Sequence, residues 1–340
     1  MKLRKYLGKF VSAAAALLTA VSLAGCAMTE RDEIEVTREA EVPPHMLFLG
    51  DSIAAGYGLD GYTSEDNYSC PSYSNLLFEQ YKAELPEEAV PTMINKAVSG
   101  ATSADLLGMI ESGELDRELK ESDAVVVSIG GNDLLDILYK LFDSVGYSPE
   151  NSSFSLDDLD LFSAASVLYG MGSEADEAIA GFSENLKAIA AGIHERTDAV
   201  LYIQTLYDPL EYYSYIPLAA DFSSEKISDF NSVVRENAAA GLSDYRIADV
   251  FEKFTNRSAD LTNMADFDIH PNAEGHKVIA SVVDSAFRDT GFTYTVTEPG
   301  EEHLTQQAKA IIIGGIAALL LVIIIAAFAA GRKKGNTSQK

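Results

Sequence analysis

The stretch His45-Met46-Leu47-Phe48-Leu49-Gly50-Asp51-Ser52 decides the fold class. Residues 46 to 49 are all apolar, and a short apolar run of this kind is typical of a strand that is covered on both faces. The glycine and the serine after it predict a sharp turn into a helix. We therefore expect an α/β domain to begin here, with Ser52 at the carboxyl end of its first strand.

Similar apolar runs alternate with helical patterns along the next 240 residues. The expected strands cover His45–Leu49, Pro91–Asn95, Ala124–Ile129, Ala199–Gln204 and Tyr245–Val250, and the expected helices cover Tyr73–Glu84, Ala104–Lys120, Glu174–Glu195, Ser224–Ala240 and Asn272–Arg288. This alternation predicts a three-layer α/β/α sandwich around a parallel five-stranded sheet. Residues 139–172 fit none of these units and are expected to form an inserted lid or cap.

The N-terminus carries the pattern of a secretion signal. Basic residues precede an apolar run from Val11 to Ala24, which is too short to span a bilayer. The run ends in Leu23-Ala24-Gly25-Cys26, which resembles a bacterial lipobox and so predicts a lipid on Cys26. Ordinary signal cleavage, with Cys26 incidental, is the alternative.

The C-terminus carries the pattern of a membrane anchor. The 21 residues from Ala310 to Ala330 hold no charge, which is long enough to cross a hydrocarbon core of about 30 Å. Basic residues follow at 332–334, so the positive-inside rule predicts a cytoplasmic end and an extracellular main domain. The expected organisation is a lipoprotein-type signal peptide at 1–25, an acidic linker without regular structure at 26–44, the main domain at 45–295, a linker at 296–309, a transmembrane helix at 310–330 and a basic tail at 331–340.

The chain is strongly acidic between its two ends. Of 340 residues, 52 are acidic and 25 are basic, and eight of the basic residues lie in 1–26 and 331–340, where there is no acid. Residues 27–330 therefore carry 17 − 52 = −35 charges, which opposes binding of nucleic acid. Cys26 and Cys70 are the only cysteines, and no Cys/His spacing suits zinc, so we expect no disulfide framework, metal or cofactor.

Four polar segments follow expected elements of the domain. They are Gly50-Asp51-Ser52, Ser99-Gly100, Gly130-Gly131-Asn132-Asp133 and Asp268-Ile269-His270-Pro271. Because sites in parallel sheets form at the carboxyl ends of the strands, we expect these segments to converge. In this order they resemble the four blocks of the SGNH or GDSL hydrolase family, and the resemblance spans about Met46 to Val283.

The resemblance implies a flavodoxin-like sheet and a role for each matching residue. Ser52 matches the nucleophile, and His270 matches the base that a weakly nucleophilic serine hydroxyl needs. The Ser52 N–H, the Gly100 N–H and the Asn132 amide match the three donors of an oxyanion hole. Ile53 stands where the family usually has leucine, which changes shape more than chemistry.

The acid that orients His270 is left open by the sequence. Family members commonly carry an aspartate three residues before the histidine, where this chain has Phe267. Asp268, Asp266 and a backbone carbonyl are the alternatives, and Asp268 is favoured because similar bacterial members carry a D-x-H-P block. Some acceptor at Nδ1 is required to keep the histidine in the tautomer that can act as a base.

Together these features predict a membrane-anchored, extracellular serine esterase or lipase that works through an acyl-enzyme. The expected substrates are short-acyl or O-acetyl esters of glycans, or lysophospholipid-like acyl esters, and the acidic surface favours neutral or zwitterionic ones. The alternative is an inactive membrane-tethered binding protein on the same fold. The four intact motif residues favour the enzyme, and the oligomeric state is not predicted.

Overall fold

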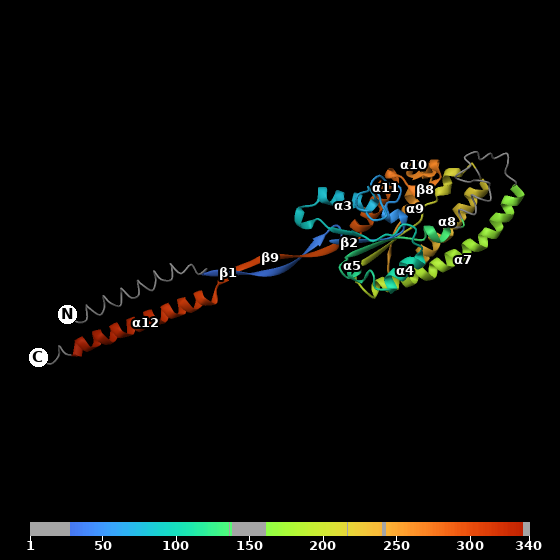
Figure 1. Cartoon of the computed structure of the whole chain (residues 1–340). Helices are drawn as coiled ribbons and strands as arrows, with labels where there is room; N and C mark the ends of the chain where they lie inside the picture. Colours follow the sequence, from blue (N-terminus) through green and yellow to red (C-terminus); the bar gives the residue numbers. More distant parts are fainter. Residues whose placement is uncertain (1–27, 136, 138–160, 216, 240–242, 336–340) are drawn as a thin grey trace. The chain divides into compact units, whose positions relative to one another are not determined.

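The computed structural model describes residues 28–135, 137, 161–215, 217–239 and 243–335 (Figure 1). The chain divides into two units. The main unit is Glu39–Tyr294, and the end unit combines Met1–Arg38 with Thr295–Lys340. The predicted signal peptide at 1–25 and Cys26 lie outside the described residues, as do residues 139–160 of the predicted insertion.

A five-stranded parallel sheet forms the centre of the main unit, as predicted. Its order is β3-β2-β4-β5-β6. The strands are β2 (His45–Gly50), β3 (Thr92–Asn95), β4 (Ala124–Ser128), β5 (Val200–Gln204) and β6 (Arg246–Ala248). The chain adds β3 on one side of β2 and then β4 on the other side. The carboxyl ends of β2 and β4 therefore flank the point where the strand order reverses, which is where open α/β sheets form their sites.

Helices cover both faces of this sheet, which confirms the three-layer sandwich. The longer helices are α3 (Tyr73–Glu84), α4 (Ser103–Glu111), α7 (Leu161–His194), α8 (Pro217–Ala239) and α11 (Ala273–Arg288), and the shorter ones are α2 (Ser52–Ala55), α5 (Asp116–Lys120), α9 (Val250–Phe254) and α10 (Ser258–Leu261). Residues of α4, α5, α7 and α8 pack with one set of strand side chains, and residues of α3, α9 and α11 pack with the alternate set.

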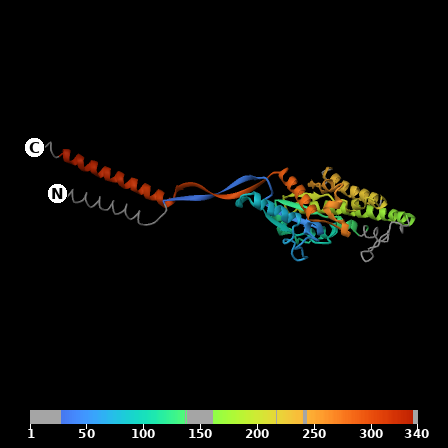
Figure 2. The same cartoon turned by 90° about the horizontal axis from the view of Figure 1, so that it is seen from above.

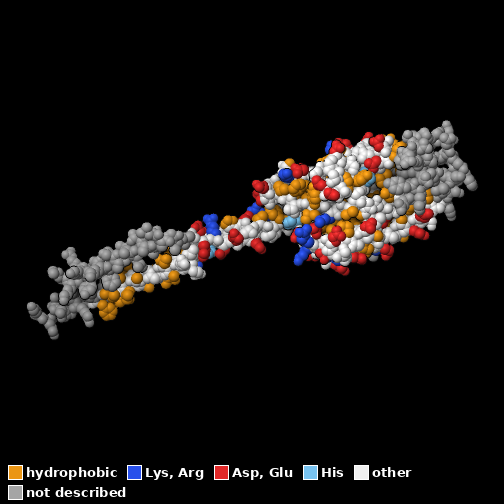
Figure 3. Space-filling view, viewed as in Figure 1, with side chains coloured by type: hydrophobic (Ala, Val, Ile, Leu, Met, Phe, Trp, Pro, Cys, Tyr) orange, Lys and Arg blue, Asp and Glu red, His pale blue; other side chains and the backbone are white. Residues whose placement is uncertain are grey.

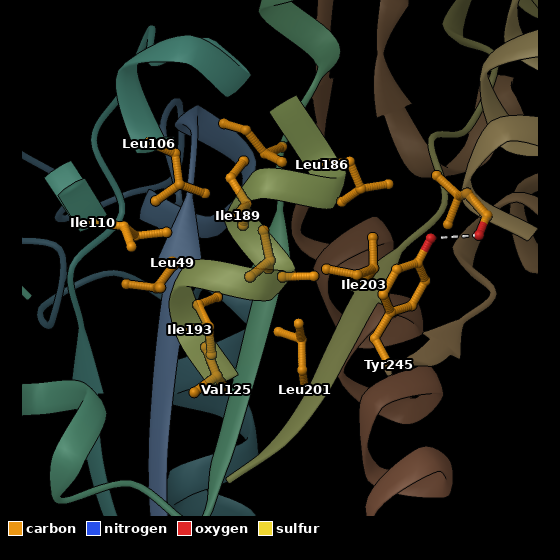
Figure 4. Close-up of a cluster of buried hydrophobic side chains, with 14 of the residues drawn as sticks. Leu49, Leu106, Ile110, Val125, Leu186, Ile189, Ile193, Leu201, Ile203 and Tyr245 are labelled. Carbon is orange, nitrogen blue, oxygen red and sulfur yellow. Dashed lines mark hydrogen bonds between the residues drawn. The ribbon is translucent and has the colours of Figure 1, made fainter. Parts of the chain in front are cut away.

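The first of these cores shows how the layers hold together. Figure 4 shows aliphatic side chains from the strands and from α4 and α7 pointing toward one another. Those labelled there are Leu49, Val125, Leu201 and Ile203 from the strands and Leu106, Ile110, Leu186, Ile189 and Ile193 from the helices. Tyr245, at the edge of this core, satisfies its buried hydroxyl by donating to the Val234 carbonyl at 2.6 Å.

Three helices differ from their predicted bounds. The helix predicted over Ala104–Lys120 is two helices, α4 and α5, because the chain turns at Gly113 with a left-handed φ of 79°. Helix α7 begins at Leu161 and α8 at Pro217, so both start earlier than predicted. The last part of the predicted insertion, from Leu161 onward, therefore belongs to α7.

The segments next to the main domain include two strands, so the prediction that the linker at 26–44 has no regular structure was wrong for Thr29–Ala40, and most of the predicted linker at 296–309 is strand as well. Strand β1 (Thr29–Ala40) pairs with β9 (Phe292–Leu304) in a two-stranded sheet. The Thr305 N–H donates to the Met28 carbonyl at one end of the pair. Threonines, valines and an isoleucine at intervals among the charges favour strands, and the density of charge hid this signal.

Helix α12 (Gln306–Gly335) covers the predicted transmembrane segment and is one continuous helix (Figure 2). Its stretch Gln306–Ile325 has a mean hydropathy of 2.8, so it is long and apolar enough to cross a membrane. A helix of that length and composition is confirmed, and its insertion in a membrane stays a prediction.

Candidate active site

The turn after β2 places Ser52 at the carboxyl edge of the sheet. Gly50 has a φ of 134°, and a Cβ there would lie 1.9 Å from the Ser128 carbonyl oxygen, so β2 and β4 can approach only with glycine at this position. Asp51 then caps α2 by accepting from the Ile53 N–H at 3.0 Å. Ser52, the first residue of α2, is 8% exposed, so most of this residue is covered by its neighbours.

Strand β8 (Asp268–Pro271) brings His270 to this serine from 218 residues away in the sequence. The His270 Nε2 atom lies 2.9 Å from Ser52 Oγ. On the other side of the ring, Nδ1 lies 2.5 Å from Asp268 Oδ1, which also accepts from the His270 backbone N–H at 3.0 Å. Of the alternatives for the acid, the structure thus brings Asp268 to the histidine, whereas the Asp266 side chain is exposed.

Two tyrosines hold His270 and its strand. Tyr207 is 6% exposed and donates its hydroxyl hydrogen to the Ile269 carbonyl at 2.7 Å, which ties β8 to the loop after β5. The ring of Tyr57 contacts the His270 ring at a tilt of 44°, with 4.6 Å between centroids. The histidine is therefore held by contacts on its backbone, on its Nδ1 atom and on its ring.

The loops after β3 and β4 carry the other two motif residues. Gly100 has a φ of 86°, and a Cβ there would meet nothing within 4 Å, so its backbone conformation rather than crowding calls for glycine. The Asn132 Nδ2 group donates to the Ala101 carbonyl at 2.8 Å. Because this amide carries two hydrogens, the bond orients it and leaves a second N–H for a ligand.

A half-buried carboxylate, Asp133, joins these two loops, and the sequence analysis did not predict this contact. Asp133 accepts from the Ser103 N–H at 2.9 Å and from the Ser103 hydroxyl at 2.5 Å. The Asn185 side chain, on α7, donates to the same hydroxyl at 2.9 Å. Asp133 therefore fixes the position of Asn132 relative to the start of α4. Its place beside Asn132 was the only signal, since a contact across 30 residues has no local pattern.

Comparison with known proteins shows the family of this chain. Residues 48–278 match the GDSL-like lipase/acylhydrolase family, over more than half of the chain. The chain belongs to this family. It is thus a carboxylic ester hydrolase, and the resemblance to the SGNH or GDSL hydrolases is confirmed.

Individual relatives of this GDSL-family hydrolase are distant. The Bacillus subtilis (strain 168) protein YpmR is 22% identical over 295 residues, which cover 86% of this chain and 98% of that protein. Two solved lipases share the fold at 17% and 18% identity: Lip_vut3 from a goat rumen metagenome (TM-score 0.53, 71% of this chain and 96% of that one) and an extracellular lipase from Streptomyces rimosus (TM-score 0.51, 71% and 99%).

Two aspartates besides Asp268, namely Asp51 and Asp133, affect the net charge beside Ser52 and Asn132 in this GDSL-family protein. Asp51 is 1% exposed, and burial raises its pKa to about 7. Burial also raises the pKa of Asp133, although the Ser103 hydrogen bonds oppose this. Burial disfavours ionisation of Asp268 as well, but the hydrogen bonds from His270 outweigh it and hold the pKa of Asp268 below its usual range. Below pH 7, Asp268 is therefore the carboxylate that faces His270, while Asp51 is mostly neutral.

A small apolar cavity of about 100 Å³ adjoins the motif residues of this GDSL hydrolase. Ile53, Gly131 and Ile269 line it, and each is the chain neighbour of a motif residue. The rest of its wall includes Leu134, Ile137, Leu206, Leu210, Phe222 and Ile227. A cavity of this chemistry beside a serine can receive an apolar group of an ester.

Proposed function

We propose that this protein is a serine esterase in which Ser52, His270 and Asp268 form the catalytic triad. The observation that carries the proposal is the continuous chain of contacts, 2.9 Å from Ser52 Oγ to His270 Nε2 and 2.5 Å from His270 Nδ1 to Asp268 Oδ1. His270 takes the proton from Ser52 as Oγ attacks the ester carbonyl carbon. Asp268 keeps a hydrogen on His270 Nδ1. The Nε2 atom therefore carries none and can accept the proton from Ser52.

The reaction then passes through two tetrahedral intermediates. The negative oxygen of each accepts hydrogen bonds from the Ser52 N–H, the Gly100 N–H and the second N–H of Asn132. As the first intermediate collapses, the alcohol leaves with the proton from His270 and the acyl group stays on Ser52 Oγ. Water, deprotonated by His270, attacks this acyl-enzyme, and the carboxylic acid leaves as Ser52 regains its proton.

The substrate is a short-acyl ester. An apolar cavity of about 150 Å³ can hold benzene, so the cavity of about 100 Å³ beside Ser52 suits an acyl chain of about four carbons or fewer. This supports short-acyl or O-acetyl esters over lysophospholipid-like esters. The charge of −35 in residues 27–330 supports an uncharged substrate.

Removal of the nucleophile tests the proposal. The Ser52→Ala variant of the full-length protein should lose at least about a thousandfold of its turnover of p-nitrophenyl butanoate, because no other group replaces the attacking oxygen. Ser122→Ala, at the opposite edge of the sheet, is the matched control and should keep full turnover. Retention of more than a few per cent of activity by Ser52→Ala, with an unchanged melting temperature, would contradict the assignment.

We further propose that the enzyme works outside the cell, held by α12 and by a lipid on Cys26 after removal of residues 1–25. The apolar stretch of α12 and the basic residues after it support this orientation. Because a spanning helix anchors a protein permanently, either anchor should suffice. Deletion of residues 310–340 and Cys26→Ala should each leave activity in the membrane fraction, and only the two changes together should release it. Release by the deletion alone would mean that Cys26 carries no lipid.

A further inference from the structure

The exposed apolar side chains of the main unit gather around the site. Among its described residues, the large apolar side chains that stay exposed are Tyr57, Tyr68, Val98, Tyr215 and Phe267, by 44, 51, 47, 58 and 41%. We call these five residues the collar. Such side chains on a soluble unit, concentrated at one site, mark a surface that binds something.

Three collar residues follow the first two strands of the sheet. Tyr57 lies five residues after Ser52, with its ring against His270. The Val98 N–H donates to the Gly50 carbonyl at 2.9 Å, which places Val98 beside the end of β2. The Tyr68 hydroxyl accepts from the Asn95 N–H at 3.0 Å, at the end of β3.

The other two collar residues lie on the side of the catalytic acid. Phe267 directly precedes Asp268, and its ring stacks on that of Tyr213 with 5.5 Å between centroids. The Tyr213 ring also contacts Tyr215, at 5.8 Å. The collar therefore flanks the Ser52–His270 pair on two sides.

Phe267 is held in an unfavourable conformation. Its φ of 57° lies in the left-handed region, which is a true outlier for a bulky side chain. Strain of this kind costs free energy and persists where the position serves a function. This left-handed residue ends the 3-10 helix Met264–Asp266 and leads into Asp268, and it leaves 41% of an aromatic side chain exposed beside the catalytic acid.

We propose that the collar binds the alcohol part of the substrate and that this part is an uncharged polysaccharide. The inference rests on the proposed esterase function and adds the class of the alcohol. Tyrosine and phenylalanine rings offer flat apolar faces, and tyrosine adds a polar tip, which together suit a sugar ring with its C–H face and hydroxyl edge.

The negative charge of the protein and the small size of the cavity favour a neutral glycan over an anionic polymer or a lipid with long acyl chains. Figure 3 shows acidic side chains spread over the visible face of the main unit, and residues 27–330 carry −35 charges, so an anionic polymer or lipid surface would be repelled. A lipid with long acyl chains would need more room beside Ser52 than a cavity of about 100 Å³. A neutral glycan that carries short acyl groups meets both limits.

The test compares three substrates with the full-length protein in detergent: p-nitrophenyl acetate, a chemically acetylated neutral glucan and dibutanoyl-phosphatidylcholine. In Tyr215→Ala and Phe267→Gly, kcat/KM on the acetylated glucan should fall about 2- to 12-fold, mainly through KM, because each loses one stacking ring. Turnover of p-nitrophenyl acetate should change less than about twofold, since the triad is untouched. Phe267→Gly should also melt at a higher temperature, because glycine adopts the left-handed conformation freely.

Two variants serve as controls. Phe267→Tyr keeps the ring and should keep its rate on the glucan. Tyr294→Ala removes an aromatic ring from β9, beside residues that line a cleft at the opposite edge of the sheet, and should change no rate.

Several results would overturn the inference. An equal fall on p-nitrophenyl acetate and on the glucan would mean that the collar only supports the catalytic centre. No fall on the glucan, or a fall confined to dibutanoyl-phosphatidylcholine, would mean that the collar does not bind glycans. Ser52→Ala separates this inference from the proposed function: activity that survives that change refutes the triad, whereas loss of activity there with unaltered collar variants refutes the collar alone.

Discussion

The two edges of the central sheet each hold a histidine paired with an aspartate, and only one of them is a candidate catalytic centre. At the carboxyl edge, His270 Nδ1 lies 2.5 Å from Asp268. At the amino edge, His45 Nδ1 lies 2.6 Å from Asp123, which also accepts from the His45 backbone N–H, as Asp268 does from His270. The contacts within the two pairs are therefore nearly the same.

Their surroundings differ in the ways that matter for chemistry. The His45 side chain is 54% exposed and that of His270 is 16% exposed, so water screens the first pair far more. The amino edge also has the larger cleft, of about 1070 Å³, lined by charged residues of both signs such as Lys120, Asp123 and Arg288. Only His270 has a serine hydroxyl within hydrogen-bond distance of Nε2. Neither a His–Asp pair nor a large cleft identifies a site without the nucleophile.

The largest expected difference between the two edges of the sheet is the effect on kcat of replacing the aspartate of each pair. Asp268→Asn should lower kcat about 10⁴-fold, because an amide in place of the carboxylate favours the wrong tautomer of His270. Asp123→Asn makes the same change in the other pair and should leave kcat unaltered. Asp266→Asn is a second control on the same loop. Comparable losses in Asp268→Asn and Asp266→Asn would show that the orienting acid is not Asp268 alone.

The next largest effect on kcat is expected from replacement of Asn132. Asn132→Ala should lower kcat about 10²- to 10³-fold, because one donor to the oxyanion is lost in the transition state. KM should change little, since the donor acts on charge that develops only after attack. A higher KM with unchanged kcat would instead mean that Asn132 binds the ground state of the substrate.

Features of the molecule that rest on local sequence patterns could be predicted, whereas features that rest on contacts between distant segments could not. The five strands are apolar runs bounded by turns, so local pattern was enough to predict them. Ser52, Gly100 and Asn132 each follow such a run, but their roles were predicted from the resemblance of the four segments together to the SGNH or GDSL family. The choice between Asp268 and Asp266 depended on the turn at Phe267, and the Asp133–Ser103 link depended on two loops meeting in space. Strands β1 and β9 were missed because their charges masked a strand pattern.

Asp51 should have the smallest effect on turnover and a clear one on stability. Its folded pKa of about 7 lies above the ordinary value for an aspartate, so the folded protein binds the proton more tightly than the unfolded chain. The stability that this gives is present in full below about pH 4 and is lost as the pH rises to about 7, by up to about 4 kcal/mol. Asp51→Asn, which keeps the helix cap, should remove this dependence and melt higher than the wild type at pH 8.

Urea unfolding of Asp51→Asn and the wild type at pH 5 and pH 8 measures this effect. Turnover at pH 6.5 should stay within about threefold of the wild type, since Asp51 is mostly neutral there. An equal pH dependence of the free energy of unfolding in both proteins would mean that Asp51 is ionised throughout this range.

The central claim is that the serine at the carboxyl edge is the nucleophile, and covalent labelling tests it most directly. A fluorophosphonate probe should phosphonylate Ser52 Oγ with loss of fluoride, because His270 activates that hydroxyl. Mass spectrometry of peptides from the labelled full-length protein should find one probe per chain, on the peptide that contains Ser52, and none in Ser52→Ala or His270→Ala. A label on another serine, or equal labelling of Ser52→Ala, would contradict the account.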